Sequence, residues 1–262
     1  MNLRNNSRNI INFFKKLMSA PQKRTKKIAV FDIDGTIFRS SLLIVLINGL
    51  VADGIFPLKA QKELEKDYLA WLDRRGTYDQ YLTQVVNIYF RHIVDCKVRD
   101  VNRIVKKVIA WEKDRVYVFT RDLVKKLKRE GYFLLAISGS PDYIVSHFAR
   151  YIGFHAYYGS MFEVKNGRFT GRAINRDSWS NKRKVLDQFL KTAPFHVDLK
   201  RSIAVGDSPG DISMLEMVGR PIVFNPDNIL ARHAVKKKWK IVVERKNVIY
   251  DIRAHRFLNN HH

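Results

Sequence analysis

The sequence contains a single cysteine, Cys96, among its 262 residues. One thiol cannot form an intramolecular disulfide, which excludes the small disulfide-rich secreted folds and favours a reducing compartment. No uninterrupted apolar run reaches the roughly 18 residues that a membrane-spanning helix needs. The best candidate, residues 42–51, contains Asn48 and Gly49 and is soon followed by Asp53, so we expect it to be a buried helix.

Acidic residues are also scarce. The chain has 48 lysines and arginines against 25 aspartates and glutamates, which gives a formal net charge of +23. Such a positive field attracts anionic partners, among them phosphorylated metabolites, lipid headgroups and nucleic acid. Ordinary solvated helix faces in a basic protein are the alternative explanation.

Residues 1–27 hold eight of these basic residues and no acidic one, and we expect them to form a tail and a linker. The spacing of their apolar residues predicts an amphipathic helix on an anionic membrane surface. We therefore expect a cytoplasmic protein with peripheral contact at the inner face of the membrane. An organellar presequence, a disordered tail, a helix docked on the body and nucleic-acid binding are alternatives. The apolar residues are Ile10, Phe13, Phe14, Leu17 and Met18.

The rest of the chain divides into an α/β part and a helical part. Residues 28–38 and 118–250 alternate apolar strands with helices, which predicts a mainly parallel sheet with right-handed crossovers. Residues 39–117 have helical spacing and no alternating strand pattern, so we expect roughly four helices there. Residues 251–262 are expected to be a C-terminal tail.

Within the α/β part, the apolar spacing predicts the individual elements. The dipeptide Asn166-Gly167 predicts a hairpin turn within residues 164–172. We expect helices at 123–130, 142–151, 182–191, 212–218 and 229–236, and strands at 132–137, 155–158, 202–205, 221–224 and 240–243.

Two aspartates one residue apart, Asp32 and Asp34, follow the apolar β-branched run that starts at Ile28. Alternate residues on a strand share a face, so both carboxylates can be directed at one site. Two carboxylates at such a short distance repel each other, unless a divalent cation or a shared proton relieves the repulsion. The pattern favours a catalytic or metal site. A turn or part of a calcium loop is the alternative, but the further oxygen ligands of an EF-hand are missing.

Three more polar motifs stand where this topology would bring them to the same edge of the sheet. Residues 138–141 (Ser-Gly-Ser-Pro) lie between a strand and a helix, where hydroxyls and free N–H groups can bind an anion. Residues 206–211 place Asp207 and Asp211 after another strand, and Lys182 begins a helix. Each motif alone also fits turn, capping or surface roles. Together they supply carboxylates, an anion cradle and a cation.

In these four motifs the sequence resembles the haloacid dehalogenase superfamily, in its phosphoserine-phosphatase-like branch, subfamily IB. The resemblance covers about residues 28–243 and includes all four motifs in order. It implies a Rossmann-like sheet with helices on both faces. It also places residues 39–117 as an inserted all-helical cap of the C1 type.

The resemblance implies a Mg²⁺-dependent phosphomonoesterase that works through an aspartyl-phosphate. Asp32 would be the nucleophile and a metal ligand, and Asp34 would protonate the leaving group and then activate water. The backbone carbonyl of Asp34 and the carboxylate of Asp207 would complete the metal ligands, with Asp211 supporting them from outside the ligand set. The groups expected to bind the phosphoryl oxygens are Thr36, Ser138, Gly139 and the catalytic Lys182.

The sequence departs from phosphoserine phosphatases at two positions of the first motif region. Ser41 stands nine residues after Asp32, where those enzymes carry a substrate-binding glutamate, and Gly35 stands where they usually carry serine. We therefore expect a small phosphorylated substrate other than phosphoserine, with a lipid-linked phosphate as one version. A phosphotransferase that uses the same intermediate and a non-catalytic basic scaffold that binds membrane or nucleic acid are the alternative functions. The oligomeric state stays open.

Overall fold

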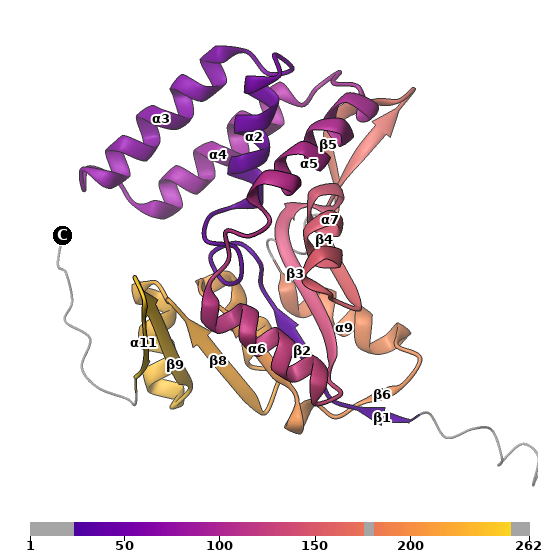
Figure 1. Cartoon of the computed structure of the whole chain (residues 1–262), viewed down its shortest axis with the longest axis vertical. Helices are drawn as coiled ribbons and strands as arrows, with labels where there is room; N and C mark the ends of the chain where they lie inside the picture. Colours follow the sequence, from indigo (N-terminus) through magenta and orange to yellow (C-terminus); the bar gives the residue numbers. More distant parts are fainter. Residues whose placement is uncertain (1–23, 176–180, 253–262) are drawn as a thin grey trace, which may run out of the picture.

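The structure is a computed structural model that describes residues 24–175 and 181–252 (Figure 1). The amphipathic helix expected near the start of the chain and most of the expected C-terminal tail lie outside the described residues. None of the helices within the described ranges is long and apolar enough to cross a membrane.

An eight-stranded sheet forms the centre of the molecule, in the order β10-β9-β8-β7-β2-β3-β4-β5. Strand β2 (Ile28–Phe31) lies between β3 (Phe133–Pro141) and β7 (Ile203–Gly206) and is parallel to both. The two outermost strands, β5 and β10, are antiparallel to their neighbours. The predicted mainly parallel α/β sheet is confirmed. The other strands are β4 (Ala156–Lys165), β5 (Arg168–Asn175), β8 (Arg220–Phe224), β9 (Lys240–Arg245) and β10 (Val248–Ile252).

Helices cover both faces of this sheet (Figure 1). All four residues of β2 are buried: Ile28 and Val30 belong to one apolar cluster, whereas Ala29 and Phe31 belong to the other. The alternation follows from the period of a strand, whose successive side chains point to opposite faces. One face carries α9 (Lys182–Thr192), α10 (Ile212–Leu215) and α11 (Asn228–Lys237), and the other carries α6 (Val118–Arg129) and α7 (Asp142–Ile152).

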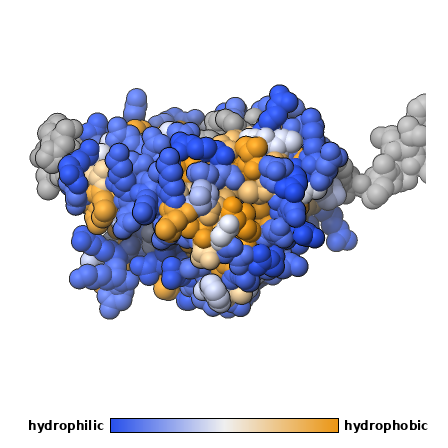
Figure 2. Space-filling view, turned by 90° about the horizontal axis from the view of Figure 1, so that it is seen from above, coloured by the Kyte–Doolittle hydropathy of each residue, from blue (hydrophilic) through white to orange (hydrophobic). Residues whose placement is uncertain are grey.

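The segment after β2 forms four helices that lie together beyond the end of that strand (Figure 1). We call them the cap. They are α2 (Leu42–Ala52), α3 (Leu58–Leu72), α4 (Tyr78–His92) and α5 (Val98–Glu112). Helices α2 and α5 pack closely because Gly49 leaves room for Val108; a Cβ at residue 49 would lie 2.4 Å from the Val108 side chain. Seen from above, the outer face of the cap shows an apolar area inside a polar surround (Figure 2).

The β4–β5 hairpin reaches out to the cap and pairs with it. Asn166 (φ 50°) and Gly167 (φ 72°) form its turn, as the Asn-Gly signal predicts. The N–H of Val98 donates to the carbonyl of Gly167 at 2.9 Å, and the N–H of Asp95 donates to the carbonyl of Phe169 at 2.8 Å. We call this contact the clasp, because it ties the loop between α4 and α5 to the core.

Several element boundaries differ from those predicted. Helix α6 begins earlier than expected, α10 ends at Leu215, and β3 and β4 run several residues further than predicted. Strand β10 was not predicted, although four of its five residues are apolar or aromatic; it lies at an exposed edge of the sheet, next to β9. It carries the described chain to Ile252, into the expected tail. A short pair, β1 (Thr25–Lys26) with β6 (His196–Val197), was also not predicted.

Candidate active site

The carboxyl ends of β2, β3 and β7 converge below the cap, and the predicted site residues follow these strands and begin α9. Asp32 comes directly after β2 and is 4% exposed. Its backbone N–H donates to the carbonyl of Val205 on β7 at 2.9 Å, which continues the pairing of the two strands. Parallel neighbours of this kind bring groups from distant parts of the chain to one edge of the sheet.

Lys182, the first residue of α9, is buried between two carboxylates. Its Nζ donates to Asp32 Oδ1 and, at 2.5 Å, to Asp211 Oδ1. Burial alone would lower the pKa of this ammonium, but Asp211 and Asp32 raise it above its usual range. Lys182 is therefore positively charged, and it fixes one oxygen of Asp32.

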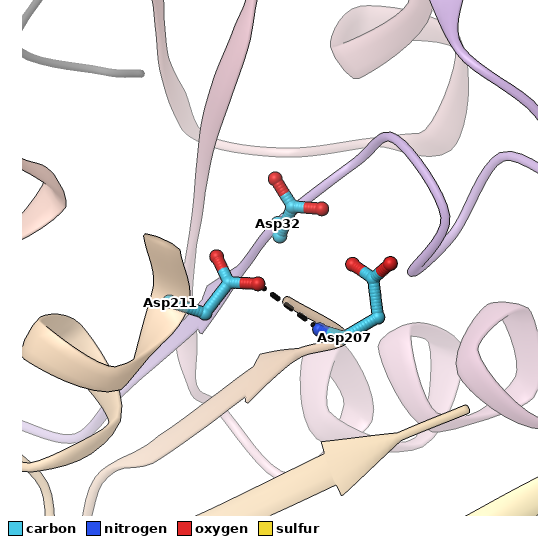
Figure 3. A group of neighbouring side chains, drawn as sticks. All are labelled: Asp32, Asp207 and Asp211. Atoms are coloured by element: carbon cyan, nitrogen blue, oxygen red, sulfur yellow. Dashed lines mark hydrogen bonds between the residues drawn. The ribbon is translucent and has the colours of Figure 1, made fainter. Parts of the chain in front are cut away.

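Asp32, Asp207 and Asp211 form a cluster in which one oxygen of each lies within 4.8 Å of the others (Figure 3). Burial, opposed by Lys182, raises the pKa of Asp32 from 3.8 to about 7. Burial and the neighbouring Asp32 and Asp211 raise the pKa of Asp207 well above its usual range. Three carboxylates face one ammonium here, so their fully ionised forms would carry more negative charge than Lys182 neutralises. Several carboxylate oxygens around one point suit a divalent cation such as Mg²⁺, which would relieve their repulsion.

Asp211 holds the loop that carries Asp207. Its Oδ2 accepts a hydrogen bond at 3.0 Å from the backbone N–H of Asp207 (Figure 3). The same oxygen accepts from the backbone N–H of Ser208 at 3.0 Å and from the Ser208 hydroxyl at 3.1 Å. Its other oxygen accepts from Lys182. Because both oxygens already have protein partners, Asp211 orients Lys182 and Asp207, and the open oxygens of the cluster belong to Asp32 and Asp207.

Asp34 is bound by a different set of groups. Its Oδ2 accepts from the Ser138 hydroxyl at 2.5 Å and from the Ser140 hydroxyl at 3.0 Å. Its Oδ1 accepts from the N–H of Leu42, the first residue of α2, at 2.6 Å. Ser140 was absent from the predicted site, although residues 138 and 140 share a face of the strand and could have indicated it. Ser138, expected to bind phosphoryl oxygens, donates to Asp34 here.

Thr36 and Gly35 both act on Asp207. The Thr36 hydroxyl donates to Asp207 Oδ1 at 2.8 Å, a contact that was not foreseen for a residue expected to bind phosphoryl oxygens. Gly35 adopts φ +80°, and a Cβ at this residue would lie 2.2 Å from Asp207 Oδ2. Only glycine accepts both the left-handed conformation and this close approach. The turn after Asp34 therefore positions a carboxylate that lies far away in the sequence.

A cavity of about 550 Å³ opens between these residues and the cap. Asp32, Gly139, Lys182 and Asp207 line it from the core, and Leu82 and Val86 of α4 line it from the cap. Ser41 also lines it; its side chain accepts from the N–H of Leu43 at 3.2 Å and so caps α2. A second cavity, of about 650 Å³, adjoins the first, and both are lined by Asp207 and Tyr78.

Comparisons with known proteins agree with this geometry. A family model described as haloacid dehalogenase-like hydrolase matches residues 29–216. The phosphoserine phosphatase of Methanocaldococcus jannaschii is 24% identical over 228 residues, which are 86% of this chain and 96% of that protein.

Two solved structures show the same fold. A protein of unknown function from Bordetella pertussis Tohama I has a TM-score of 0.66 and 20% identity, over 83% of this chain and 98% of that one. A phosphoserine phosphatase solved as a phospho-aspartyl intermediate analogue has a TM-score of 0.57 and 22% identity, over 86% of this chain and 96% of that one.

Proposed function

Because the chain belongs to the haloacid dehalogenase-like hydrolases, we propose that it is a divalent-cation-dependent phosphatase in which Asp32 attacks the phosphoryl group of a small phosphate ester. One observation carries this proposal. Asp32 and Asp34 leave the same strand, yet Lys182 holds the first and two serine hydroxyls hold the second. Two carboxyl groups in such different surroundings can divide the roles of nucleophile and proton donor.

The reaction takes place in two steps. In the first, the free oxygen of Asp32 bonds to phosphorus and the ester P–O bond breaks, while Asp34 gives its proton to the departing alkoxide. In the second, water attacks phosphorus, Asp34 takes a proton from that water, and the bond between phosphorus and Asp32 breaks. Inorganic phosphate leaves, and both aspartates return to their starting states.

Asp32 and Asp207, with the backbone carbonyl of Asp34, would hold the cation, and Mg²⁺ fits a site of this kind because it prefers oxygen ligands and keeps several waters. Bound there, the cation supplies positive charge that neutralises the phosphoryl oxygens. Thr36 and Asp211 keep Asp207 in place through the contacts described above. Lys182, with the N–H of Gly139, binds the phosphoryl oxygens on the other side of Asp32.

The substrate differs from phosphoserine in this proposal, although the curated relative named above is a phosphoserine phosphatase. Residue 41 lines the catalytic cavity and is serine, which carries no charge to pair with a substrate ammonium. Transfer to a second alcohol instead of water would use the same residues. Such transfer can be detected by adding glycerol: glycerol phosphate then forms, and less inorganic phosphate is released.

The test is a measurement of inorganic phosphate released from a panel of phosphorylated metabolites, with Mg²⁺ and with EDTA. We expect hydrolysis of at least one ester, its loss in EDTA and its recovery when Mg²⁺ is restored. If no ester in the panel releases phosphate, p-nitrophenyl phosphate included, the protein is not a phosphatase. If EDTA leaves turnover unchanged, the role given to the cation is wrong.

Membrane attachment through residues 1–27 and a cytoplasmic location stay predictions. Sedimentation with anionic vesicles, at physiological salt, should carry down the full chain but not a chain that begins at Lys26. If the full chain and the shortened chain sediment equally, the membrane role is contradicted. If the full chain binds nucleic acid but not vesicles, the nucleic-acid alternative is favoured.

A further inference from the structure

The second cavity adjoins the catalytic cavity on the side of the cap. Its walls include Gly35, Tyr78, Asp207 and Asn225, all of which also line the catalytic cavity. The rest of its wall comes mainly from α2, α3 and α4 of the cap. The alcohol part of an ester whose phosphoryl group is held at Asp32 can therefore extend past Tyr78 into this cavity, whose size suits a small organic group.

Four aromatic rings from two cap helices form one side of this cavity. Tyr68 and Trp71 come from α3, and Tyr78 and Tyr81 come from α4. The ring centres of Trp71 and Tyr78 are 5.1 Å apart, and the rings of Trp71 and Tyr81 are 6.3 Å apart and parallel within 7°. These rings are in mutual contact, so they form a continuous aromatic wall.

This wall differs from the aromatic clusters of the core. Phe56 and Tyr89 contact each other inside the cap and are at most 1% exposed. In the cavity wall, only Tyr81 is buried, whereas Tyr68 is 41% exposed and Tyr78 is 40% exposed. Aromatic side chains that only pack in a core would be buried. The exposed rings of this wall are therefore available to contact a ligand.

Polar groups that can contact a heterocycle surround the rings. Asn48 is an exposed amide on α2, between residues that are mostly buried, and Gln61 is exposed on α3; both line the cavity. Their amide groups can donate and accept hydrogen bonds at the edge of a ring. The Arg39 guanidinium lies 5.3 Å from the centre of the Tyr117 ring in the same cavity, and it adds a positive charge.

We propose that this cavity binds a planar nitrogen heterocycle and that the substrates of the enzyme are nucleoside monophosphates. The inference rests on the proposed phosphatase function. A base stacks on aromatic rings and pairs through its edge with amides, and both kinds of group are present. A quaternary ammonium would need rings that enclose it, but these rings contact one another, and Arg39 offsets the charge of Glu65, which also lines the cavity. An acyl chain would make no use of the two amides or of the charged groups Arg39 and Glu65 that line the cavity.

A matched pair of substrates tests the proposal. AMP and ribose 5-phosphate carry the same phosphorylated hydroxymethyl group and differ in the base, so their leaving groups have similar chemistry. We expect kcat/KM for AMP or UMP to exceed that for ribose 5-phosphate by about tenfold or more, the usual effect of one stacked base. Equal values would overturn the proposal. So would a preference for phosphocholine over phosphoethanolamine without any preference for nucleotides.

Two tryptophan variants connect the preference to the wall. Trp71→Ala should reduce the ratio of kcat/KM for AMP to that for ribose 5-phosphate by about fivefold or more. The matched control is Trp111→Ala, because Trp111 is 80% exposed on α5 and lies outside the cavity. That variant should keep the wild-type ratio. If both variants change the ratio by the same factor, the cavity does not recognise the base.

Binding separates a failure of this inference from a failure of the proposed function. AMP should quench the tryptophan fluorescence of wild type and of Trp111→Ala, whereas ribose 5-phosphate should not. Trp71→Ala should lose the quenching. If AMP quenches but no ester is hydrolysed, the phosphatase function is wrong and the cavity assignment stands. If esters are hydrolysed but AMP neither quenches nor is preferred, the cavity assignment is wrong.

Discussion

The core wall of the catalytic cavity and the aromatic cap wall of the adjoining second cavity are built by different means. The core wall consists of charged groups at strand ends and at a helix start, such as Asp32 and Lys182, which are each 4% exposed. The cap wall consists of rings on α3 and α4, of which Tyr68 and Tyr78 are about 40% exposed. Each group of the core wall has charged or hydrogen-bonded partners from other strands, whereas the rings contact mainly one another.

This difference indicates which properties of the enzyme can change. A substitution in the core wall leaves a buried charge without its partner, which is costly. A substitution in the cap wall removes one aromatic ring or exposes another, and it leaves no buried charge without a partner. The core therefore fixes the reaction, and the cap can change the substrate without disturbing the chemistry. The following changes test that division, from the largest expected effect to the smallest.

Asp32→Asn should give the largest loss, because an amide cannot attack phosphorus. We expect kcat to fall by a factor on the order of 10⁶, as for removal of other catalytic nucleophiles. The measurement is release of p-nitrophenol from p-nitrophenyl phosphate, with circular dichroism to show that the fold is kept. Asp187→Asn, on the exposed side of α9, is the matched control and should retain activity. Residual turnover above the background of a clean preparation would contradict the assignment of the nucleophile.

Asp34→Asn should cost less, and its cost should depend on the ester. General acid catalysis contributes about 10²–10⁴-fold, and it matters most where the departing alkoxide is basic. We therefore expect a larger fall in kcat/KM for an alkyl phosphate than for p-nitrophenyl phosphate. Equal losses for the two esters would show that Asp34 acts in some other way.

Gly35→Ala should disturb the core wall without removing any of its charges. The new methyl group would meet Asp207 Oδ2, and we expect kcat/KM to fall by about 10²-fold, as for other small displacements in active sites. Gly54→Ala is the matched control: Gly54 has φ +73°, close to the +80° of Gly35, but nothing lies within 4 Å of a Cβ there. Both variants should lose stability through backbone strain. If Gly54→Ala loses as much activity, the contact with Asp207 is not the cause.

The pH dependence of stability should also distinguish the two walls. Without metal, the folded-state pKa of Asp32 is raised to about 7 from 3.8. The folded protein therefore keeps a proton that the unfolded chain has lost. This stabilisation is complete below pH 3.8 and disappears as the pH rises through 7. Between pH 5 and 8 it amounts to about 2 kcal/mol of the free energy of unfolding.

Urea unfolding in EDTA at pH 5 and pH 8 measures this difference. From pH 5 to pH 8, the free energy of unfolding should fall less in Asp32→Asn than in wild type. Mg²⁺ should stabilise wild type more at pH 8 than at pH 5. Asp53→Asn is the control in the cap, because hydrogen bonds from Arg103 and Lys107 lower the pKa of Asp53 to about 2. Asp53 stays ionised at both values, so this variant should follow wild type. The same loss in all three proteins would contradict the role of Asp32.

The smallest effect concerns the clasp between the cap and the β4–β5 hairpin. Gly171 has φ +81°, and a Cβ there would lie 2.6 Å from the Val94 side chain. Gly171→Ala should therefore lower the free energy of unfolding by about 1 kcal/mol more than Gly167→Ala, whose Cβ would meet nothing within 4 Å. Urea unfolding gives the values, and amide exchange at Asp95, which donates to Phe169, should quicken more in Gly171→Ala than in Gly167→Ala. Equal stability of the two variants would show that the contact is unimportant.

The core wall could be predicted from the sequence to a large extent. Parallel strands end at one edge of the sheet, so motifs after residues 31, 137 and 205 had to meet there, and Lys182 joined them. The partners of each group could not be predicted. Thr36 contacts Asp207 across 171 residues of sequence, and Ser138 contacts Asp34 across 104. Such pairs depend on where each strand ends relative to its neighbours in the sheet.

The cap wall was harder to predict for a different reason. A helical period identifies which residues face inward, but it does not distinguish a packed core from a cavity. Tyr81 and Tyr89 lie on the same helix and are both buried, yet Tyr81 lines a cavity and Tyr89 is covered by other rings. The clasp was missed because backbone pairing between distant loops leaves no periodic signal.

The clasp also bears on how quickly the enzyme can work. The cap is tied at its base as well, where the N–H of Arg39 donates to the carbonyl of Arg115 at 2.9 Å. Because these contacts hold both ends of α5, we expect opening of the cap to involve mainly α3 and α4, which are joined by the turn at residues 73–77. These helices also carry the aromatic rings. If recognition and release depend on this one movement, a cap that binds its ligand more tightly lets the product go more slowly.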